Sequence, residues 1–213
     1  ADEIAMLLAN RTTLMAGISH DLRTPLTRMR LALALLPDNV EPELVQRFER
    51  NLEVMDTLIG DALRFAQGTR ESPQPVALAA YVREILSTFE QPIEITSQIS
   101  DDVVVDLAPN AFSRVLANLV GNGVKYASKV QVRLSATAIV VSDDGPGIPQ
   151  SERGRVFQPF YRMEISRNVS TGGSGLGLAV VQQLSVVHGW QVEIGESAAG
   201  GASFTWRFVS SST

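Results

Sequence analysis

Apolar residues recur every three or four positions through the first part of the chain, and this spacing constrains the fold more than any other feature. Gaps that alternate between three and four are typical of a helix packed against partner helices. In a first helix, predicted from Asp2 to Leu36, these positions are Met15, Ile18, Leu22, Leu26 (or Pro25), Met29, Leu33 and Leu36. In a second helix they are Val45, Phe48, Leu52, Met55, Ile59, Ala62 and Ala66.

A turn over residues 37–42 separates the two helices, and Pro42 suits the start of the second one. A hairpin of this length leaves much of its apolar surface uncovered. We therefore expect two copies of the chain to associate as a four-helix bundle. A bundle within one chain is the alternative, but the sequence supplies no further helices with this spacing.

His20 and Asp21 lie on the first helix, away from its apolar seam. His20 follows Ile18 by two residues, about 200° around the helix, so it points to the opposite face. Imidazole has a pKa of about 6.5 and is a competent nucleophile near neutral pH, while an adjacent carboxylate can accept its ring N–H. The alternative is a solvated surface histidine. Pro25 removes the N–H that would bond the carbonyl of Asp21, which predicts a kink beside His20.

Composition excludes several classes of protein. The 213 residues suffice for one large domain or two modest ones, and 45% hydrophobic with 19% charged residues is typical of globular proteins. A net charge of −5 indicates no nucleic-acid or anionic membrane partner. The sequence has no cysteine and two histidines, so thiolate and multi-histidine metal sites are excluded. It has neither a signal peptide nor a membrane-spanning apolar run, and it starts within a predicted helix, so we expect a fragment of a longer protein.

The pattern changes after the second helix. Residues 67–75 are polar, contain glycine and two prolines, and are predicted to form a linker. Beyond them, helix and strand patterns are mixed, which predicts an α+β sandwich with one sheet and helices on one face. The predicted helices are Ala80–Phe89, Pro109–Tyr126 and Gly175–His188, the last ended by Gly189. The predicted strands are Ile93–Ile99, Val103–Leu107, the hairpin of Val130–Ser135 and Ile139–Ser142, Val192–Gly195 and Ser203–Val209.

Three motifs in this second part carry polar or glycine residues. Asn118 and Asn122 are four residues apart, so both side chains leave one helix face. Asp143 ends a predicted strand and precedes a tight glycine turn. Residues 172–178 form a glycine run that opens a helix, where backbone N–H groups can approach a phosphate. No Gly-Lys-Ser/Thr follows, and Val180 replaces the last glycine of a Rossmann fingerprint, so neither of those motifs is present.

These motifs, in this order and downstream of His20, resemble those of the sensor histidine kinases of two-component systems. Ser19–Leu26 resembles the H box, Asn118–Tyr126 the N box, Asp143–Gly147 the G1 box, Phe157–Arg162 the F box and Gly173–Leu178 the G2 box. The segment Met15–Arg28 is most similar to the EnvZ-type osmosensor group. The resemblance implies a dimerisation and histidine phosphotransfer domain at residues 1–67, a linker at 68–75 and an ATP-binding domain of the GHKL (Bergerat) fold at 76–213.

The resemblance also implies the reaction. His20 would accept a phosphoryl group from ATP, with Asp21 orienting and deprotonating it, and pass it to an aspartate of a response-regulator receiver domain. Thr24, one turn beyond His20, would position water for dephosphorylation of that regulator, with a solvated helix threonine as the alternative. The fragment would be a homodimer without membrane contact of its own, the cytoplasmic portion of a bacterial inner-membrane sensor kinase.

In the ATP-binding domain, the resemblance implies that Asn122 holds Mg²⁺, with Asn118 nearby, and that Asp143 accepts the adenine amino group. Lys125 and Arg162 would face phosphates and Tyr126 the nucleotide, with solvated surface residues as the alternative for these three. The other implied cofactor-binding residues are Gly145, Gly147, Gly173, Gly175, Leu176, Gly177 and Leu178. Residues 161–174 are expected to form a mobile lid that packing of Phe157 and Phe160 anchors. His188 is interpreted as a helix-end residue without chemistry.

Two other functions compete with this one. An ATPase of the gyrase, Hsp90 or MutL kind places a glutamate one turn before the metal-binding asparagine, whereas this chain has Asn118, which cannot act as a base. A nucleotide-binding scaffold without kinase activity is disfavoured by the presence of His20, Asp21, Asn122 and Asp143. One departure from the family is Gly123, where alanine is common, and it should weaken the helix by up to ~1 kcal/mol.

Overall fold

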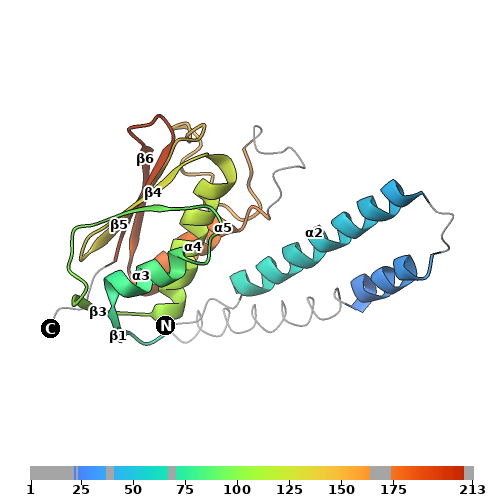
Figure 1. Cartoon of the computed structure of the whole chain (residues 1–213), viewed down its shortest axis with the longest axis horizontal. Coiled ribbons are helices and arrows are strands. Elements are labelled where there is room, and N and C mark those ends of the chain that lie inside the picture. Colours follow the sequence, from blue (N-terminus) through green and yellow to red (C-terminus); the bar gives the residue numbers. More distant parts are fainter. Residues whose placement is uncertain (1–21, 23, 37–40, 67–70, 164–173, 209–213) are drawn as a thin grey trace. The chain divides into compact units, whose positions relative to one another are not determined.

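The computed structural model describes residues 22, 24–36, 41–66, 71–163 and 174–208. They group into two compact units, one that contains the described residues up to 66 together with 174–176, and one that contains residues 71–163 and 177–208. In the first unit, residues 24–34 are helical and α2 spans Pro42–Ala66, starting at the predicted proline. Arg30 Nη2 lies 3.7 Å from Asp56 Oδ2, and Leu26 and Leu52 are buried. The two helices therefore form the predicted hairpin (Figure 1).

The predicted apolar seam of this hairpin is only partly covered. Leu26 and Leu52 are at most 4% exposed, but five other seam residues have between 42% and 52% of their surface exposed. They are Leu22, Met29, Leu36, Phe48 and Met55. No helix among the described residues is long and apolar enough to cross a membrane.

The second unit is an α+β sandwich, as predicted. Its elements are β1 (Gln74–Ala77), α3 (Leu78–Leu86), β2 (Glu94–Ser97), β3 (Val104–Leu107), α4 (Pro109–Tyr126), β4 (Val130–Leu134), β5 (Ala138–Asp143), α5 (Gly177–His188), β6 (Gln191–Glu196) and β7 (Ala202–Arg207). Five strands form a sheet of order β2-β4-β5-β7-β6, in which only the β2–β4 pair is parallel. The expectation of a single sheet is wrong, because β1 and β3 pair antiparallel in a separate ribbon.

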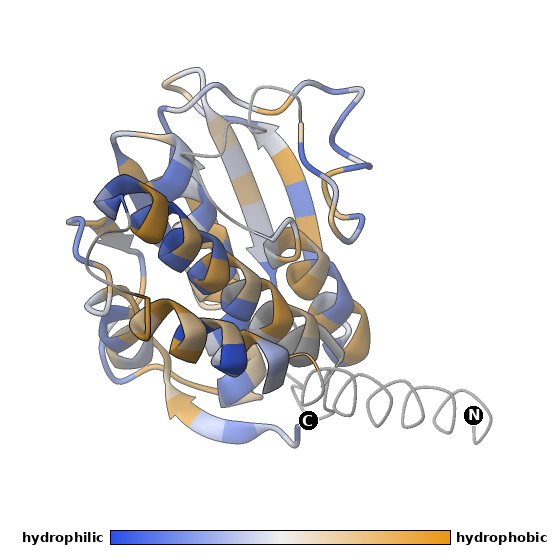
Figure 2. Ribbon diagram, turned by 90° about the vertical axis from the view of Figure 1, so that its right-hand side faces the viewer, coloured by the Kyte–Doolittle hydropathy of each residue, from blue (hydrophilic) through white to orange (hydrophobic). Residues whose placement is uncertain are grey.

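The core lies between the five-stranded sheet and the three helices that cover one face of it (Figure 1). Along β4, the buried residues Val130, Val132 and Leu134 alternate with exposed ones. Figure 2 shows this alternation as hydrophobic and hydrophilic bands along the strands. Ile139 of β5 faces Trp206 of β7 in the register, and both are fully buried. Alternation with period two directs every second side chain toward the helices.

An aromatic cluster attaches α4 to the sheet. Phe112, fully buried near the start of α4, lies with its ring centroid 4.6 Å from that of Trp206 and 5.3 Å from that of Phe208. The ring of Trp190 meets those of Phe112 and Trp206 edge-on at 6.5 and 5.3 Å. Such pairs contribute about 0.5–1.5 kcal/mol each beyond the burial of their area. The cluster therefore fixes the helix on which Asn118 and Asn122 lie.

Local signals placed both ends of α4 and the end of α5 correctly, whereas α5 begins at Gly177, two residues after the predicted start at Gly175. Pro109 stands in the first turn of α4, and its bounds match the prediction. At the end of α5, Trp190 N–H donates to Ser185 O (2.7 Å) and Gly189 N–H to Val186 O (3.4 Å). Gly189 has φ 69°, so these bonds form a Schellman motif with glycine in the left-handed position. His188 is the last residue of α5, as predicted, and its ring stacks on Trp190 at 4.7 Å.

Several boundaries differ from expectation. α3 begins at Leu78, two residues before the predicted start, and ends at Leu86. β1 begins within the segment expected to be a linker, although it contains Pro75. Proline is tolerated there because β1 has β3 as a partner on one side only.

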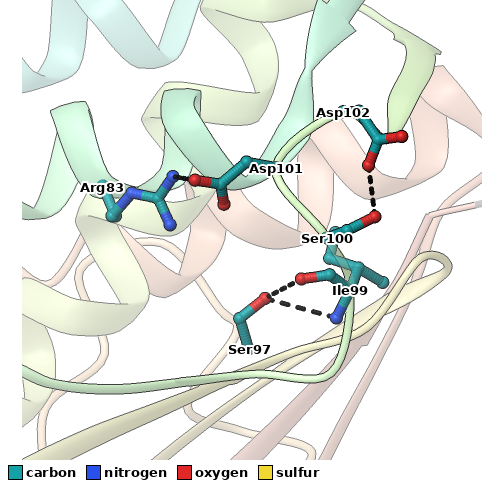
Figure 3. A network of polar contacts seen from close by, with 6 residues as sticks. All are labelled: Arg83, Ser97, Ile99, Ser100, Asp101 and Asp102. Atoms are coloured by element: carbon teal, nitrogen blue, oxygen red, sulfur yellow. Dashed lines mark hydrogen bonds and ion pairs between the residues drawn. The ribbon is translucent and has the colours of Figure 1, made fainter.

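The loop between β2 and β3 is held by short polar contacts (Figure 3). Arg83 of α3 pairs with Asp101 at 2.8 Å, and the hydroxyl of Ser97 donates to Ile99 O at 2.8 Å. Ser100 donates a hydrogen bond to the carboxylate of Asp102, and this bond is the main cause that lowers the pKa of Asp102. All of these groups are exposed, so each contact contributes little to stability.

Candidate functional site

The expected phospho-acceptor segment falls largely outside the described residues. His20 and Asp21 belong to that undescribed part, as does the point where Pro25 was expected to kink the helix. Thr24 is described and lies in the first helix with an exposed side chain. The structure therefore shows that Thr24 is part of a helix, whereas the roles of His20 and Asp21 stay predictions.

Both asparagines of the N-box-like motif lie in α4 and are partly buried. The amide of Asn118 donates to Arg114 O (2.7 Å), which fixes the direction of its Oδ1. A methyl group added at Gly177 would lie 2.9 Å from that oxygen. The first residue of α5 therefore lies directly against Asn118, and a side chain at residue 177 would require the Asn118 amide to shift.

Asp143 ends β5 on the inner face of the sheet and is only 8% exposed. Its Oδ1 accepts hydrogen bonds from the backbone N–H groups of Gly145 (2.9 Å) and Ala202 (3.0 Å). Among the described residues, none donates a hydrogen bond to Oδ2, so that oxygen can accept a hydrogen bond from a ligand. The carboxylate is thus oriented by the protein before any ligand arrives.

The turn between β6 and β7 holds Asp143 in place, a contribution that the sequence did not indicate. The hydroxyl of Ser197 donates to Asp143 O (2.6 Å) and accepts from Gly201 N–H (3.0 Å). A methyl group added at Gly201 would lie 2.5 Å from Asp143 Oδ1 and 2.7 Å from its carbonyl carbon. The backbone of this turn therefore lies against the carboxylate with no space for a side chain.

Gly123 lies close to Val130 and Asp143, and these contacts explain why glycine stands where alanine is common. A methyl group there would be 2.9 Å from Val130 Cγ2 and 3.7 Å from Asp143 Cβ. Val130 faces Asp143 across the β4–β5 pair and fills the space that an alanine in α4 would need. The glycine thus allows α4 to approach the strand end that carries Asp143.

The glycine turn after Asp143 connects the remaining parts of the site. Gly145 lies against the end of α4, where an added methyl group would be 2.9 Å from Tyr126 O, and Gly147 (φ 70°) lies beside the carbonyl of Gly200. The carboxylate of Asp144 accepts from the N–H groups of Ser128 and Lys129, each at 2.8 Å. These backbone bonds, that of Lys129 foremost, lower the pKa of Asp144.

The three residues expected to contact the nucleotide are Lys125, Tyr126 and Arg162, and all three are described. Lys125 Nζ lies 5.0 Å from the ring centroid of Tyr126, at the end of α4, and both side chains are partly buried. Arg162 is partly buried as well, and its Nε atom is inaccessible to solvent.

Tyr161, the first residue of the expected lid, forms a small polar group with two residues that precede the lid. Tyr161 donates a hydrogen bond to the carboxylate of Glu152, and Arg155 lies 4.6 Å over the Tyr161 ring and 3.3 Å from Glu152 Oε1. Phe157 is partly buried, but Phe160 is 65% exposed with φ 64°. The expectation that Phe160 anchors by packing is therefore wrong. Most of the expected lid, residues 164–173, lies outside the described residues.

The glycine run reaches the start of α5. Gly173 lies outside the described residues, Gly175 has φ 70°, and Leu176 N–H bonds Ser174 Oγ at 3.3 Å. Leu176 is buried and Leu178 partly buried, so they are packing residues in the structure. Gly177 is the first residue of α5, which leaves the N-terminal N–H groups of a twelve-residue helix at this place.

Together these elements can bind a ligand with an N–H donor at one end and negative charge at the other. The oriented carboxylate of Asp143 suits the donor, and the start of α5 suits an anion. Asn118 and Asn122 of α4 supply neutral amide oxygens, which are ligands that a hard divalent cation accepts.

Comparisons with known proteins identify the family to which each part of the chain is similar. Residues 10–71 match the family model of the His Kinase A (phospho-acceptor) domain. Residues 108–211 match that of the histidine kinase-, DNA gyrase B- and HSP90-like ATPase. His20 lies within the first match, and Asn118, Asn122 and Asp143 lie within the second.

Curated relatives match both parts of the chain. Sensor protein RstB of Escherichia coli (strain K12) is 34% identical over 222 residues, which cover 97% of this chain and 51% of RstB. Sensor histidine kinase CpxA of the same strain is 30% identical over 217 residues, which cover 92% of this chain and 46% of CpxA. The chain therefore spans about half the length of these relatives.

Solved structures share the fold. Full-length ShkA, crystallised in complex with AMPPNP, is 25% identical with a TM-score of 0.70, over 93% of this chain and 47% of ShkA. The histidine kinase AdeS of Acinetobacter baumannii is 22% identical with a TM-score of 0.61, over 91% of this chain and 98% of AdeS. With a phospho-acceptor domain followed by an ATPase domain of this kind, and with relatives that span nearly all of its length, the chain belongs to the sensor histidine kinases.

Proposed function

We propose that this chain transfers the terminal phosphoryl group of ATP to His20 and then to an aspartate of a response-regulator receiver domain. The observation that carries the proposal is the buried carboxylate of Asp143, oriented by two N–H groups beside α4 in the part matched by the ATPase family. Asp143 Oδ2 would accept a hydrogen bond from the adenine amino group. The crystal structure of the relative ShkA contains AMPPNP, which supports a nucleotide at such a site.

Asn122 is the residue that we expect to hold Mg²⁺, with Asn118 one turn away on the same helix. A neutral amide oxygen suits a cation whose charge the phosphates already balance. When bound, Mg²⁺ would neutralise charge that develops on the phosphate oxygens. The backbone N–H groups at the start of α5 would also stabilise the negative charge of the phosphates, as would the side chains of Lys125 and Arg162.

His20 would act as the nucleophile. One ring nitrogen attacks the terminal phosphorus as the bond from that phosphorus to the oxygen of ADP breaks. Asp21 accepts the proton of the other ring nitrogen and thereby keeps the attacking nitrogen unprotonated. His20 lies within the match to the phospho-acceptor family, which supports this assignment.

Asn118 favours transfer to histidine over hydrolysis of ATP. An ATPase of this superfamily needs a carboxylate at that place to activate water, and an amide cannot accept the proton. The Asn118 amide is moreover engaged with Arg114 O and faces Gly177 through Oδ1. The described geometry thus contains no base at the place where the ATPases have one.

Incubation with γ-labelled ATP and Mg²⁺ tests the proposal. We expect acid-labile, base-stable label on the wild-type chain, none on His20→Gln, and greatly reduced label on Asp143→Asn because nucleotide binding fails. His20→Gln should bind ADP as the wild type does. Release of free phosphate without protein label would support the ATPase instead, and nucleotide binding with neither product would support a scaffold.

The assembly and location of the whole protein are proposals as well. The exposed seam residues Leu22, Met29, Phe48 and Met55 support a homodimer through the first two helices, because a partner hairpin would cover them. RstB and CpxA are sensor proteins of about twice this length. We therefore propose that the chain is the cytoplasmic portion of a membrane sensor kinase.

A further inference from the structure

Glu71 makes a long-range contact with the start of α4. Its Oε1 accepts hydrogen bonds from Asn110 Nδ2 (2.8 Å) and from Asn110 N–H (3.3 Å), and its Oε2 accepts from Ala111 N–H (3.1 Å). The two carboxylate oxygens thus satisfy two of the backbone donors that the first turn of a helix leaves free.

No residue near α4 in the sequence provides this cap. The N-cap position is Ala108, whose side chain makes no capping hydrogen bond, and the first turn of α4 contains no acidic residue. Glu71 therefore places the negative charge at the positive end of the helix from 39 residues away. A helix that carries its own cap would not need this contact.

The position of Glu71 in the chain, shortly after the end of α2, indicates what this contact does. Helix α2 of the first unit ends at Ala66, and Glu71, which belongs to the second unit, follows five residues later. Its partner α4 carries Asn122, twelve residues beyond Asn110 and so about 18 Å along the helix. Glu71 therefore touches no nucleotide-binding residue, and any effect on the reaction must act through position.

We propose that Glu71 is a positioning residue for phosphoryl transfer, whose carboxylate fastens the segment after α2 to the start of α4. The tether, defined as the chain between Ala66 and the first residue anchored in the second unit, then ends at residue 71. This inference rests on the proposed transfer to His20, because the tether limits how far the ATP-binding unit can move from the helix that carries His20.

The length of the tether sets the expected effect. Five residue steps separate Ala66 from Glu71, and they span at most about 18 Å whatever their conformation. Without the cap, the first anchored residue would be Gln74, which pairs with Leu107 in β1, and eight steps span at most about 29 Å. The effective concentration of one tethered unit at the other falls roughly as the −3/2 power of the tether length, which predicts about a twofold slower transfer.

The test compares Glu71→Ala with the exposed acid Glu90→Ala as a matched control. The rate of His20 phosphorylation is measured in the full chain at saturating ATP, together with the Kd for ADP. We expect Glu71→Ala to slow phosphorylation about twofold at an unchanged Kd, and Glu90→Ala to match the wild type. Insertion of Gly-Ser-Gly between Gly68 and Thr69 lengthens the tether by the same three steps without touching α4, and should slow phosphorylation to the same degree.

A purely structural role of Glu71 gives a different result. Ala108→Ser in the Glu71→Ala background supplies a local N-cap, because Ala108 already has the extended backbone of that position (φ −81°, ψ 100°). We expect the double variant to regain thermal stability and to stay slow. Recovery of the rate together with stability, or an unchanged rate in Glu71→Ala, would overturn the proposal.

A distance measurement tests the tether without any chemistry. The chain has no cysteine, so Glu49→Cys on α2 and Glu84→Cys on α3 introduce the only two spin-label sites. Labelled protein is mixed with excess unlabelled protein, so that a dimer carries one labelled protomer. Glu71→Ala should broaden the distance distribution, and an unchanged width would overturn the proposal. Absence of label on wild-type His20 would contradict the proposed function instead and leave this measurement to decide on the tether.

Discussion

Gly201→Ala should weaken nucleotide binding strongly, although Gly201 belongs to none of the recognised motifs. An alanine Cβ at residue 201 would lie 2.5 Å from Asp143 Oδ1 and 2.7 Å from the carbonyl carbon of Asp143. Because the carbonyl carbon belongs to the backbone, no rotation of a side chain can relieve this second contact. The β6–β7 turn must therefore move away from β5. Its displacement breaks the bond from Ala202 N–H to Oδ1 and the bond from Ser197 to Asp143 O.

The magnitude follows from the bonds that orient the carboxylate. A hydrogen bond to a charged group contributes about 1.5–3 kcal/mol. When the bond from Ala202 N–H is lost, the Asp143 carboxylate can turn away from the ligand. We expect this change to weaken binding by about 2–3 kcal/mol. Since 1.4 kcal/mol is a factor of ten, the Kd for ADP should rise between about 30- and 150-fold.

Isothermal titration calorimetry with ADP measures this effect in the full chain, at a temperature at which circular dichroism shows each variant to be folded. Gly195→Ala is the matched control, because its Cβ would meet nothing closer than Ser203 O at 3.9 Å. It should bind ADP as the wild type does. An affinity of folded Gly201→Ala within threefold of the wild type would refute the role assigned to this turn.

Three other substitutions have distinct expected outcomes. Gly123→Ala should lower the free energy of unfolding by about 1–2 kcal/mol in urea titrations, because overpacking against Val130 exceeds the gain in helix propensity. In a Val130→Ala background the same change should raise the free energy of unfolding. A raised free energy of unfolding in both backgrounds would contradict this explanation. Tyr81→Phe removes the bond to Pro109 O (2.8 Å) and should cost about 1 kcal/mol near neutral pH. Burial raises the pKa of Tyr81 above 10.0, so the advantage in Tm of the wild type over Tyr81→Phe should be complete below pH 10 and be lost as the pH rises through the raised pKa; an advantage that does not decrease as the pH rises above 10 would contradict the assignment. Thr24→Ala should reduce dephosphorylation of the response regulator more than autophosphorylation, and equal loss of both rates would exclude a specific role for this threonine.

Features that depend on neighbouring residues were predictable from the sequence. The bounds of α4 follow from Pro109 at its start and from its apolar spacing, and the end of α5 follows from Gly189. The β4–β5 hairpin follows from two short apolar runs, one of them alternating with polar residues. Each of these signals lies within a few residues of the feature that it predicts.

Features that depend on distant contacts were not predictable. Nothing near Ala108 indicates that Glu71 caps α4, and nothing near Gly201 indicates that it lies against Asp143. β1 escaped prediction because Pro75 disfavours a strand unless one edge stays unpaired. Phe160 was expected to pack because aromatic residues usually do, whereas here it is exposed with a left-handed backbone.

The central claim is that ATP bound by the second unit phosphorylates His20. The most direct measurement is mass spectrometry at neutral pH of peptides from the wild-type chain after incubation with ATP and Mg²⁺, with His20→Gln as the control. We expect one phosphorylated residue, His20, and no phosphopeptide from the variant. Nucleotide-bound, folded protein without phosphate on His20, or with phosphate on another residue that His20→Gln retains, would contradict the account.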